Sequence, residues 1–424
     1  PWLQRVTRLA PRATLAFATT CRGYEGTGRG FVLRFLAWVR SEGRPLKEIT
    51  LRQPIRFDPG DPLEALVARA LLLEDFPSPS FPSEGRYQGE LKQVVYSGED
   101  KFALVEDESL LRQVFGLLVH SHYRTRPRDL AHLLDAPELA VHALIEGGQV
   151  LAVSLVAREG GLTAAQCRKM ARGEGRPQGQ ALPDTLICHS GAVEAGELTF
   201  VRSVRIAVHP EYRRRGLASR LVEKIHASYA VDAFGTIFGA TPEVIRFRRA
   251  LGYRLVRVGA SRGARTGEPA AVMIRPVSHR AHALVKALET ELARNLPWQL
   301  RAFAAEGLPL DQELQQALQE GLPAPVPLAP DALEAAVAAY LESARPADTM
   351  GHVFGRWVAS WEEQLTLLDR RTATLLRARW LEGRSWSEVA EAAGYGDAGK
   401  AMKAMRSAVR SLWAVLPSTL RDGG

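Results

Sequence analysis

The chain has 424 residues, 46% of them hydrophobic and 24% charged, which excludes a disordered or fibrous protein and indicates two to four globular domains. We find no apolar run of the roughly 18 residues that a membrane span needs, and no signal-peptide pattern. A net charge of +8 favours an anionic partner, with RNA or DNA ahead of a membrane surface.

The basic residues are mostly arginine, since only 8 of the 55 are lysine. Arginine presents a planar fork that suits phosphates, although a GC-rich genome would give the same bias. Three scattered cysteines, Cys21, Cys167 and Cys188, argue against disulfides and a zinc site and for a reducing cytoplasm. Because the first residue is Pro1 rather than Met, we expect a truncated form.

Residues 1–90 predict a small α/β piece followed by a linker. An apolar strand, a glycine-rich turn and a second apolar run span residues 13–39. A helix is expected over 61–73, because Asp61 is a good N-cap and apolar residues follow at helical spacing. Residues 75–89 are rich in Pro, Ser and Gly, as linkers are.

Strands and helices alternate over residues 91–278. The expected strands are a hairpin that turns at Gly147-Gly148, a long strand that ends near Val208, and three shorter strands at 236–240, 253–259 and 269–277. Helices are expected over 108–123 and 242–253. We predict that the polar, glycine-rich stretch 158–191 is a mobile loop.

Residues 279–424 contain only helical patterns. The last part predicts helix, turn, helix, turn, helix, with Ser385 and Glu388 forming a capping box. Its basic residues suit a nucleic-acid backbone, but they also fit an ordinary solvated face, and the shape does not exclude DNA readout. These residues are Arg370, Arg371, Arg377, Arg379, Lys400, Lys403, Arg406 and Arg410.

One loop has a specific pattern. Arg213–Ala218 reads R-R-R-G-L-A, between an apolar strand and an amphipathic helix. Such a loop points backbone N–H groups and a helix N-terminus into one concavity that suits a pyrophosphate, and Gly216 would allow close approach. A basic helix cap is the alternative. Neither a Rossmann nor a P-loop motif occurs. The strand-loop-helix context resembles the Gcn5-related N-acetyltransferase fold.

Four further motifs sharpen the resemblance. They are GYEGTGRGF (23–31), QPIRFDPGDPLE (53–64), SHYRTRPRDLAHLLDAP (121–137) and RIAVHP (205–210), in this order. Together they resemble the tRNA(Met) cytidine acetyltransferase family. The resemblance implies an α/β chain with three parts: a remnant of a RecA-like helicase lobe at 1–90, a Gcn5-related N-acetyltransferase domain at 91–278, and an all-α tRNA-binding domain at 279–424.

The resemblance also assigns ligands. It implies acetyl-CoA and tRNA as partners, with ATP and Mg²⁺ bound only by the intact protein, because no Walker A lysine motif occurs here. Arg29 would reach the ATP phosphates, unless it is a turn arginine. No membrane or metal site is expected, and the oligomeric state stays open. The residues expected to bind acetyl-CoA are Ile206, Ala207, Val208, Arg213, Arg214, Arg215, Gly216, Leu217, Ala218, Ser219 and Glu243.

The expected reaction is acetyl transfer to the exocyclic amine of a tRNA cytidine, the wobble cytidine of elongator tRNA(Met) in this family. His122 is our first candidate for the proton acceptor, and His209, directly after the cofactor strand, is the second. Either could be a structural histidine. His189 and Glu194 remain candidates, and Tyr123 and Arg124 could bind a nucleotide.

Two other functions remain open from the sequence. One is an amine acetyltransferase of the same fold that acts on proteins or small molecules and has a basic accessory domain. The other is a nucleic-acid-binding protein that keeps the fold without catalysis. The ordered motifs favour the RNA enzyme, since a peptide acetylase needs no helicase-type lobe.

Overall fold

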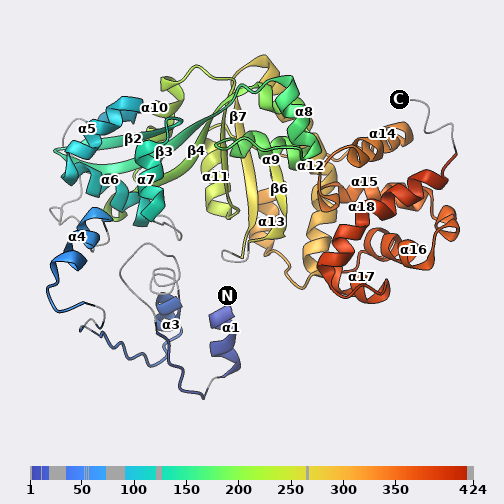
Figure 1. Ribbon diagram of the computed structural model, residues 1–424, viewed down its shortest axis with the longest axis horizontal. Coiled ribbons are helices and arrows are strands. Elements are labelled where there is room, and N and C mark those ends of the chain that lie inside the picture. The colour runs from blue at the N-terminus through green and yellow to red at the C-terminus, as the bar shows by residue number, and fades with distance from the viewer. Residues whose placement is uncertain are drawn as a thin grey trace. The chain divides into compact units, whose positions relative to one another are not determined.

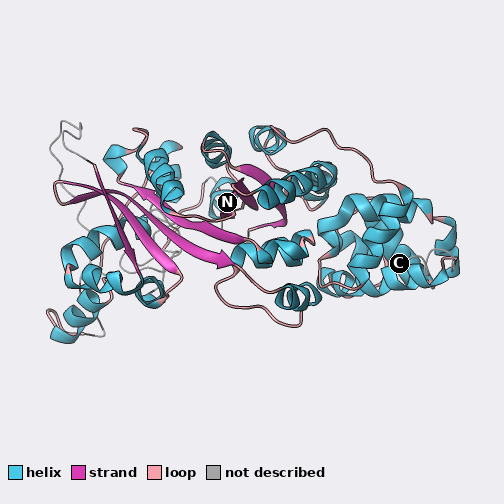
Figure 2. Ribbon diagram, turned by 90° about the horizontal axis from the view of Figure 1, so that it is seen from above, coloured by secondary structure: helices cyan, strands magenta, loops and turns pink. Residues whose placement is uncertain are grey.

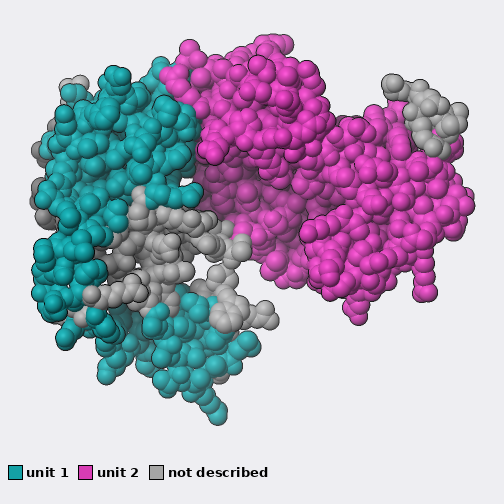
Figure 3. Space-filling view, in the orientation of Figure 1, with its two compact units in different colours: residues 1–157, 203–229 teal, residues 158–202, 230–424 magenta. Residues whose placement is uncertain are grey.

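The computed structural model describes residues 2–10, 12–18, 35–51, 53, 55, 57–72, 91–120, 127–263 and 267–417. The chain divides into two units, residues 1–157 with 203–229, and residues 158–202 with 230–424 (Figure 3). A seven-stranded sheet has the order β1-β2-β3-β4-β5-β7-β6, and the region after it is helical (Figures 1 and 2). The expected α/β class with an all-α C-terminal region is confirmed.

The sheet of the first unit is antiparallel where its first three strands pair. Strand β1 (Lys92–Ser97) pairs with β2 (Leu139–Glu146), which pairs with β3 (Gln149–Gly160). Gly147 and Gly148 join β2 to β3 with φ of +55° and +79°, the left-handed region that glycine adopts without strain. Strand β4 (Thr199–Val208) follows in the sheet, and both hairpin and long strand were predicted.

Helices cover one face of this sheet through an apolar core. Val141 and Ala143 of β2 are fully buried against side chains of three helices, among them Phe115 and Leu133. Burial of this kind, about 25 cal/mol per Å² of apolar surface, is the main force that holds the helices on the strands. The helices of the first unit are α1 (Trp2–Leu9), α3 (Ala37–Ser41), α4 (Pro62–Ala70), α5 (Lys101–Glu106), α6 (Glu108–His120), α7 (Pro127–Asp135) and α10 (Leu217–Ser228), with 3₁₀ turns η2 (Gly98–Asp100) and η4 (Pro210–Tyr212).

The N-terminal segment matches its prediction in part. Asp61 caps α4, accepting hydrogen bonds from the N–H groups of Leu63 and Glu64. Residues 12–18, where we expected a strand, are neither helix nor strand, and the end of the second apolar run forms α3. Residues 19–34, with the glycine-rich turn, and the linker lie outside the described residues.

A buried histidine connects β2 to the end of α10. His142 lies between Val141 and Ala143 and therefore points to the opposite face of the sheet. Its Nδ1 is 3.0 Å from Gln93 Nε2, which can only donate, so Nε2 carries the proton and donates to the Tyr229 hydroxyl at 2.8 Å. Burial lowers the pKa of His142 to about 4, so the ring is neutral at pH 7.

We expect this histidine to make the first unit acid-sensitive. Its pKa is about 4 in the folded protein and 6.5 as the ordinary value, so the unfolded chain binds the proton more readily between these pH values. Stability is therefore full above pH 6.5 and falls below it, by up to about 1.4 kcal/mol per pH unit. The variant His142→Gln should lose this part of the slope in urea unfolding at pH 7, 6 and 5.

An exposed histidine serves as the control for that measurement. His132 lies on α7 of the same unit and is exposed. His132→Gln should leave the wild-type pH dependence unchanged. A wild-type slope in His142→Gln would show that the acid sensitivity arises elsewhere.

In the second unit, β5 (Ala233–Gly239), β7 (Pro269–Pro276) and β6 (Arg254–Arg262) pair antiparallel in that order. Helix α12 (His279–Ala305) and helix α9 (Ala181–Ser190) share a core with them, in which Leu182 and Ile274 are fully buried. Helix α11 (Pro242–Ala250) is capped by Thr241. These strands and helix α11 agree with the prediction.

The stretch 158–191 was predicted to be a mobile loop, and this was wrong. It contains α8 (Ala164–Arg172) and α9, and η3 (Val193–Glu197) follows. A capping box of Thr163 and Gln166 starts α8. The glycines that suggested a loop are helix ends, since Gly173 and Gly191 both have φ of +77°. Buried Cys167, Met170, Ile187 and Cys188 form a small core.

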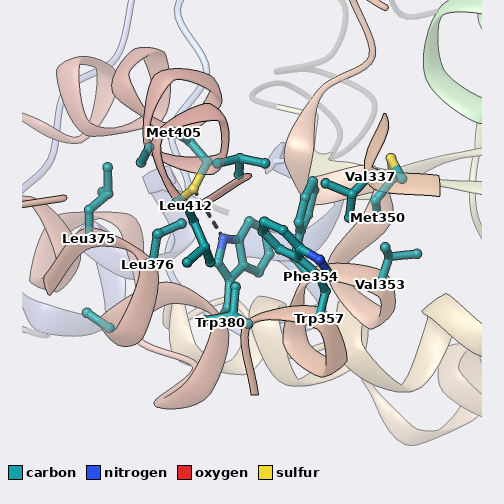
Figure 4. Close-up of a cluster of buried hydrophobic side chains, with 14 of the residues drawn as sticks. Val337, Met350, Val353, Phe354, Trp357, Leu375, Leu376, Trp380, Met405 and Leu412 are labelled. Atoms are coloured by element: carbon teal, nitrogen blue, oxygen red, sulfur yellow. Dashed lines mark hydrogen bonds between the residues drawn. The ribbon is translucent and has the colours of Figure 1, made fainter. Parts of the chain in front are cut away.

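The C-terminal region is all helical, as predicted. Trp298, Trp357 and Trp380 lie in its core, where the Trp380 Nε1–H donates to Met405 Sδ at 3.1 Å (Figure 4). The Ser385–Glu388 capping box is present. The elements after α12 are α13 (Gln312–Gln319), α14 (Pro330–Leu341), η5 (Ala347–Met350), α15 (Gly351–Ser360), η6 (Glu363–Leu367), α16 (Arg370–Leu376), the π-helical turn η7 (Arg377–Leu381), α17 (Trp386–Ala392) and α18 (Ala398–Val415).

Candidate functional site

The arginine loop connects β4 to α10 in the first unit. Strand β4 ends at Val208, η4 follows, and α10 begins at Leu217. The backbone N–H of His209 donates to the Leu151 carbonyl at 2.9 Å, so the loop starts from a point fixed on β3. At its other end, Leu221 and Ile225 are buried and hold α10 in place. The segment that carries the expected acetyl-CoA residues is therefore anchored at both ends.

Glycine is needed at the start of α10. Gly216 is the N-cap residue, with φ of +78° and ψ of −1°, and it offers no side-chain acceptor to the first N–H groups of the helix. A Cβ at Gly216 would meet no atom within 4 Å. The open space and the uncapped amides of Leu217, Ala218 and Ser219 fit an anionic group that approaches the backbone closely.

The loop is also strongly cationic. Arg213, Arg214 and Arg215 are all exposed, and none forms an ion pair within the part of the chain that the structure describes. The Arg213 Nε–H donates to the Val208 carbonyl at 3.4 Å, and the Arg215 guanidinium lies 5.2 Å from the ring centre of Tyr212. Arg214 has φ of +60°, an unusual backbone for a non-glycine residue and a mark of a functional constraint.

The strand side of the site consists of Ile206, Ala207 and Val208. Ala207 is buried in the apolar core below α6 and α7, while Ile206 and Val208 are half-buried. Their backbone belongs to the carboxyl end of β4, a few residues before the loop. The structure thus brings ten of the eleven residues expected at acetyl-CoA into one strand-loop-helix segment.

His209 lies inside this segment but is buried. Its side chain is 2% exposed and its ring packs edge-on against Tyr212, with ring centres 5.7 Å apart. Burial lowers the pKa of His209, Glu211 raises it and Arg213 lowers it again, and the net shift is downward. The ring is neutral near pH 7 and is covered by protein atoms.

The remaining predicted residues lie elsewhere. Glu243 is in the first turn of α11 in the second unit. In the same unit, His189 is half-buried near the end of α9, where burial and then Arg257 lower its pKa, and Glu194 is exposed on η3. Four predicted residues lie outside the described part of the chain: Arg29, His122, Tyr123 and Arg124.

An ion pair that the sequence did not reveal lies beside the strand. Arg205 Nη2 is 2.9 Å from Asp129 Oδ2, which connects β4 to the first turn of α7. Asp129 belongs to the motif that contains His122, and Arg205 directly precedes Ile206. The two residues are 76 positions apart, so no local pattern could have indicated the contact.

Most basic residues of the C-terminal region have partners within the protein. Arg406 donates to the carbonyls of Tyr340 and Arg345, and Arg410 to that of Leu341. Arg371, Arg377 and Lys400 also have partners, the Gly394 carbonyl, Glu362 and Asp397. Arg379 is 3% exposed, so it was wrongly predicted to face a nucleic acid. Of the eight, only Arg370 and Lys403 form none of these contacts.

Two other kinds of site were searched in the described residues. No group of three or more His, Cys, Asp or Glu side chains is arranged there to hold a metal ion. Among the same residues, no helix has the length and apolar character to cross a bilayer.

Comparison with known proteins identifies two segments of the N-terminal 233 residues. Residues 1–74 match the family model "RNA cytidine acetyltransferase NAT10/TcmA, helicase domain", and residues 113–233 match "GNAT acetyltransferase 2". The acetyltransferase fold expected from the arginine loop is thereby confirmed.

Curated relatives extend the match over nearly the whole chain. The tRNA(Met) cytidine acetyltransferase TmcA of Nitrosococcus halophilus is 36% identical over 97% of this chain and 55% of its own length. That of Haloarcula marismortui is 36% identical over 97% of this chain and 53% of its own length.

A solved structure is only distantly similar. The ribosomal-protein-S18-alanine N-acetyltransferase from Escherichia coli is 15% identical, covers 44% of this chain and 95% of its own, and gives a TM-score of 0.30, too low to support an argument. The chain spans about half the length of the curated relatives it matches. It belongs to the tRNA(Met) cytidine acetyltransferase family.

Proposed function

We propose that this chain transfers the acetyl group of acetyl-CoA to the exocyclic amine of a cytidine in tRNA. The acceptor is the wobble cytidine of elongator tRNA(Met), the reaction takes place in the cytoplasm, and the intact protein couples it to ATP hydrolysis. The observation that carries the proposal is the loop at Gly216, where uncapped backbone amides and exposed arginines meet an open space. The names of the curated relatives support a cytidine of tRNA(Met) as the acceptor.

Each of the three expected domains would have its own role in this reaction. Residues 1–90 would belong to a helicase-type lobe, 91–278 to the acetyltransferase and 279–424 to the tRNA-binding part. In the first of these, Arg29 would contact the ATP phosphates in the intact protein. Glu243 would add a contact to acetyl-CoA from α11.

Binding of acetyl-CoA would use the backbone. Arg213–Ser219 would hold the pyrophosphate through N–H groups and guanidinium charges, and the N–H groups of Ile206–Val208 would orient the acetyl arm. An N–H near the carbonyl oxygen would stabilise the negative charge that forms there during attack.

The acceptor amine requires placement more than activation. The amine of cytosine is conjugated with its ring and is a poor nucleophile, but it has no proton to lose before it attacks. Holding it against the thioester can contribute several kcal/mol, while unstacking the base costs a few. A base must then take one proton from the nitrogen, and the C–S bond breaks so that coenzyme A leaves as its thiolate.

We propose that His122 is the base that accepts this proton. His209 is the second candidate, but its 2% exposure keeps it from solvent and substrate in this conformation. His122 precedes α7, and the ion pair of Asp129 with Arg205 holds the start of α7 at β4, next to the acetyl-CoA segment. This contact supports His122 because it brings Asp129, in the middle of the same motif, to the strand.

The test is transfer of label from [acetyl-¹⁴C]acetyl-CoA to tRNA. The products are digested to nucleosides and separated, with protein acceptors tested in parallel and each reaction run with and without ATP. Label in acetylcytidine is expected. Label only in protein would favour the alternative amine acetyltransferase, and acetyl-CoA binding without any transfer would contradict catalysis by this chain.

A further inference from the structure

A groove of about 920 Å³ lies in the second unit where β6 and β7 meet the start of α12. Its walls also include the turn after α13, at residues 321–323. Ligand pockets in proteins have volumes of about 300–1,000 Å³, so this groove is far larger than a single inorganic ion requires. None of the residues expected to bind acetyl-CoA lines it.

The groove carries an excess of positive charge. Its basic side chains are Arg254, Arg275, His279, His282 and Lys286. Its one carboxylate, Glu289, lies 2.7 Å from the Nε of Arg254, so this pair is neutral as a whole. Within the described residues, Arg275 and Lys286 have no ion pair and donate no side-chain hydrogen bond.

The basic side chains of α12 lie in a row. His279, His282 and Lys286 recur at steps of three and four residues, so they share one side of α12, and all three are exposed. Seven residues of helix cover about 10 Å. Stacked nucleotides advance by roughly 3.4 Å each, so this distance accommodates about three of them.

Arg275 is held beside the row by packing. Gly252 has φ of +82°, and a Cβ there would lie 3.3 Å from Arg275 Nε. The absence of a side chain at Gly252 therefore leaves room for the guanidinium, which is half-buried without any carboxylate partner. A fixed guanidinium without a counter-ion is suited to an anionic ligand.

Part of the lining is apolar. Val285 is buried, Leu322 is half-buried and Pro323 is exposed. Apolar surface beside a row of basic side chains fits a ligand with charge on one side and flat or apolar groups on the other. A nucleic-acid strand has both, with phosphates on one side and riboses and bases on the other.

We propose that this groove binds the phosphodiester backbone of the RNA substrate, at about two or three consecutive phosphates. The inference rests on the proposed function, since it concerns the same tRNA. The basic residues of the C-terminal helices are mostly engaged within the protein. Arg275 and Lys286, in contrast, are available for phosphate.

The experiment measures the affinity of the whole chain for an elongator tRNA(Met) transcript as a function of salt. The variants are Lys286→Gln, Arg275→Gln/Lys286→Gln and His282→Gln/Lys286→Gln, and Lys169→Gln is the control, an exposed lysine of α8 in the same unit. The slope of log Kd against log salt should fall by about 1 for each lost phosphate contact. Affinity should fall about tenfold in the Arg275/Lys286 variant and stay unchanged in the control.

Unchanged slope and affinity in both double variants would overturn the inference, as would a wild-type chain that does not bind tRNA. The His282/Lys286 variant changes only exposed residues, so a failure to fold cannot explain its result. The two proposals fail separately. If the wild type transfers label and the double variants bind tRNA with unaltered affinity, only the proposed binding of RNA in the groove is contradicted. If the salt slope depends on the groove residues but no label is transferred, only the proposed catalytic function is contradicted.

Discussion

Replacing Gly216 with valine will weaken acetyl-CoA binding at least tenfold, a loss of about 1.4 kcal/mol. The residue has φ of +78°, a backbone conformation that costs a side-chain-bearing residue roughly 1–2 kcal/mol and that β-branched residues rarely adopt. The valine side chain would also fill the open space in which we place the pyrophosphate. Isothermal titration with acetyl-CoA measures the loss.

A second glycine separates strain from ligand contact. Gly383 has φ of +67°, and a Cβ there would also meet no atom within 4 Å, but it lies in the C-terminal helical region. Gly383→Val should therefore carry a similar backbone cost and bind acetyl-CoA as the wild type does. Equal affinities for the two variants would show that the space at Gly216 is not used by the ligand.

Replacing Arg379 with methionine will destabilise the C-terminal region by about 1.5–3 kcal/mol. Arg379 is 3% exposed and lies 2.8 Å from Asp348 and 3.5 Å from Glu306, and its guanidinium lies 4.6 Å from the ring centre of Trp386. Without it, Asp348, which is half-buried, and Glu306, which is exposed, lose their counter-charge. Urea unfolding followed by tryptophan fluorescence should show the shift, because Trp298 and Trp380 also surround the guanidinium.

The control is an arginine two residues earlier. Arg377 is also ion-paired, with Glu362, but both side chains are more than 40% exposed. Exposed pairs contribute roughly 0–1 kcal/mol, so Arg377→Met should hardly move the unfolding midpoint. Similar losses in both variants would contradict the claim that burial makes Arg379 important.

Most strands of the sheet could be predicted because local sequence patterns indicate them. Gly147-Gly148 between two apolar runs predicts a tight hairpin. The apolar run before His209 predicts one long strand. Strand β1 was missed, because it is a short edge strand with half-buried and exposed residues and has no strong alternation.

The error at 158–191 has a physical cause. The polar, glycine-rich composition was taken as a sign of a mobile loop, but Gly173 and Gly191 each end a helix in the left-handed conformation. The opposite signal was present, since Thr163 followed by Gln166 is a capping box. The buried positions within these helices depend on contacts with distant residues, which a local pattern does not contain.

The site could be predicted as far as its backbone. A glycine in an arginine-rich turn before a helix predicts free backbone amides at the start of that helix. The structure gives Gly216 the left-handed conformation that this arrangement requires. The positive φ of Arg214 and the Asp129–Arg205 pair could not be predicted, because tertiary packing determines both. For the same reason, the sequence could not distinguish basic residues that face solvent from those, like Arg406, that bind backbone carbonyls.

The contact of Arg406 with the Tyr340 carbonyl affects how this protein is made. The two residues are 66 positions apart, and Arg406 closes the exposed carbonyl end of α14. At about 5–20 residues per second, a ribosome needs about 3 to 13 s to synthesise that interval. During this time the apolar face of α14, with Leu333 and Val337, has no α18 to cover it. The C-terminal region can therefore complete its folding only after α18 has been synthesised, and until then a chaperone that binds apolar segments would find its target there.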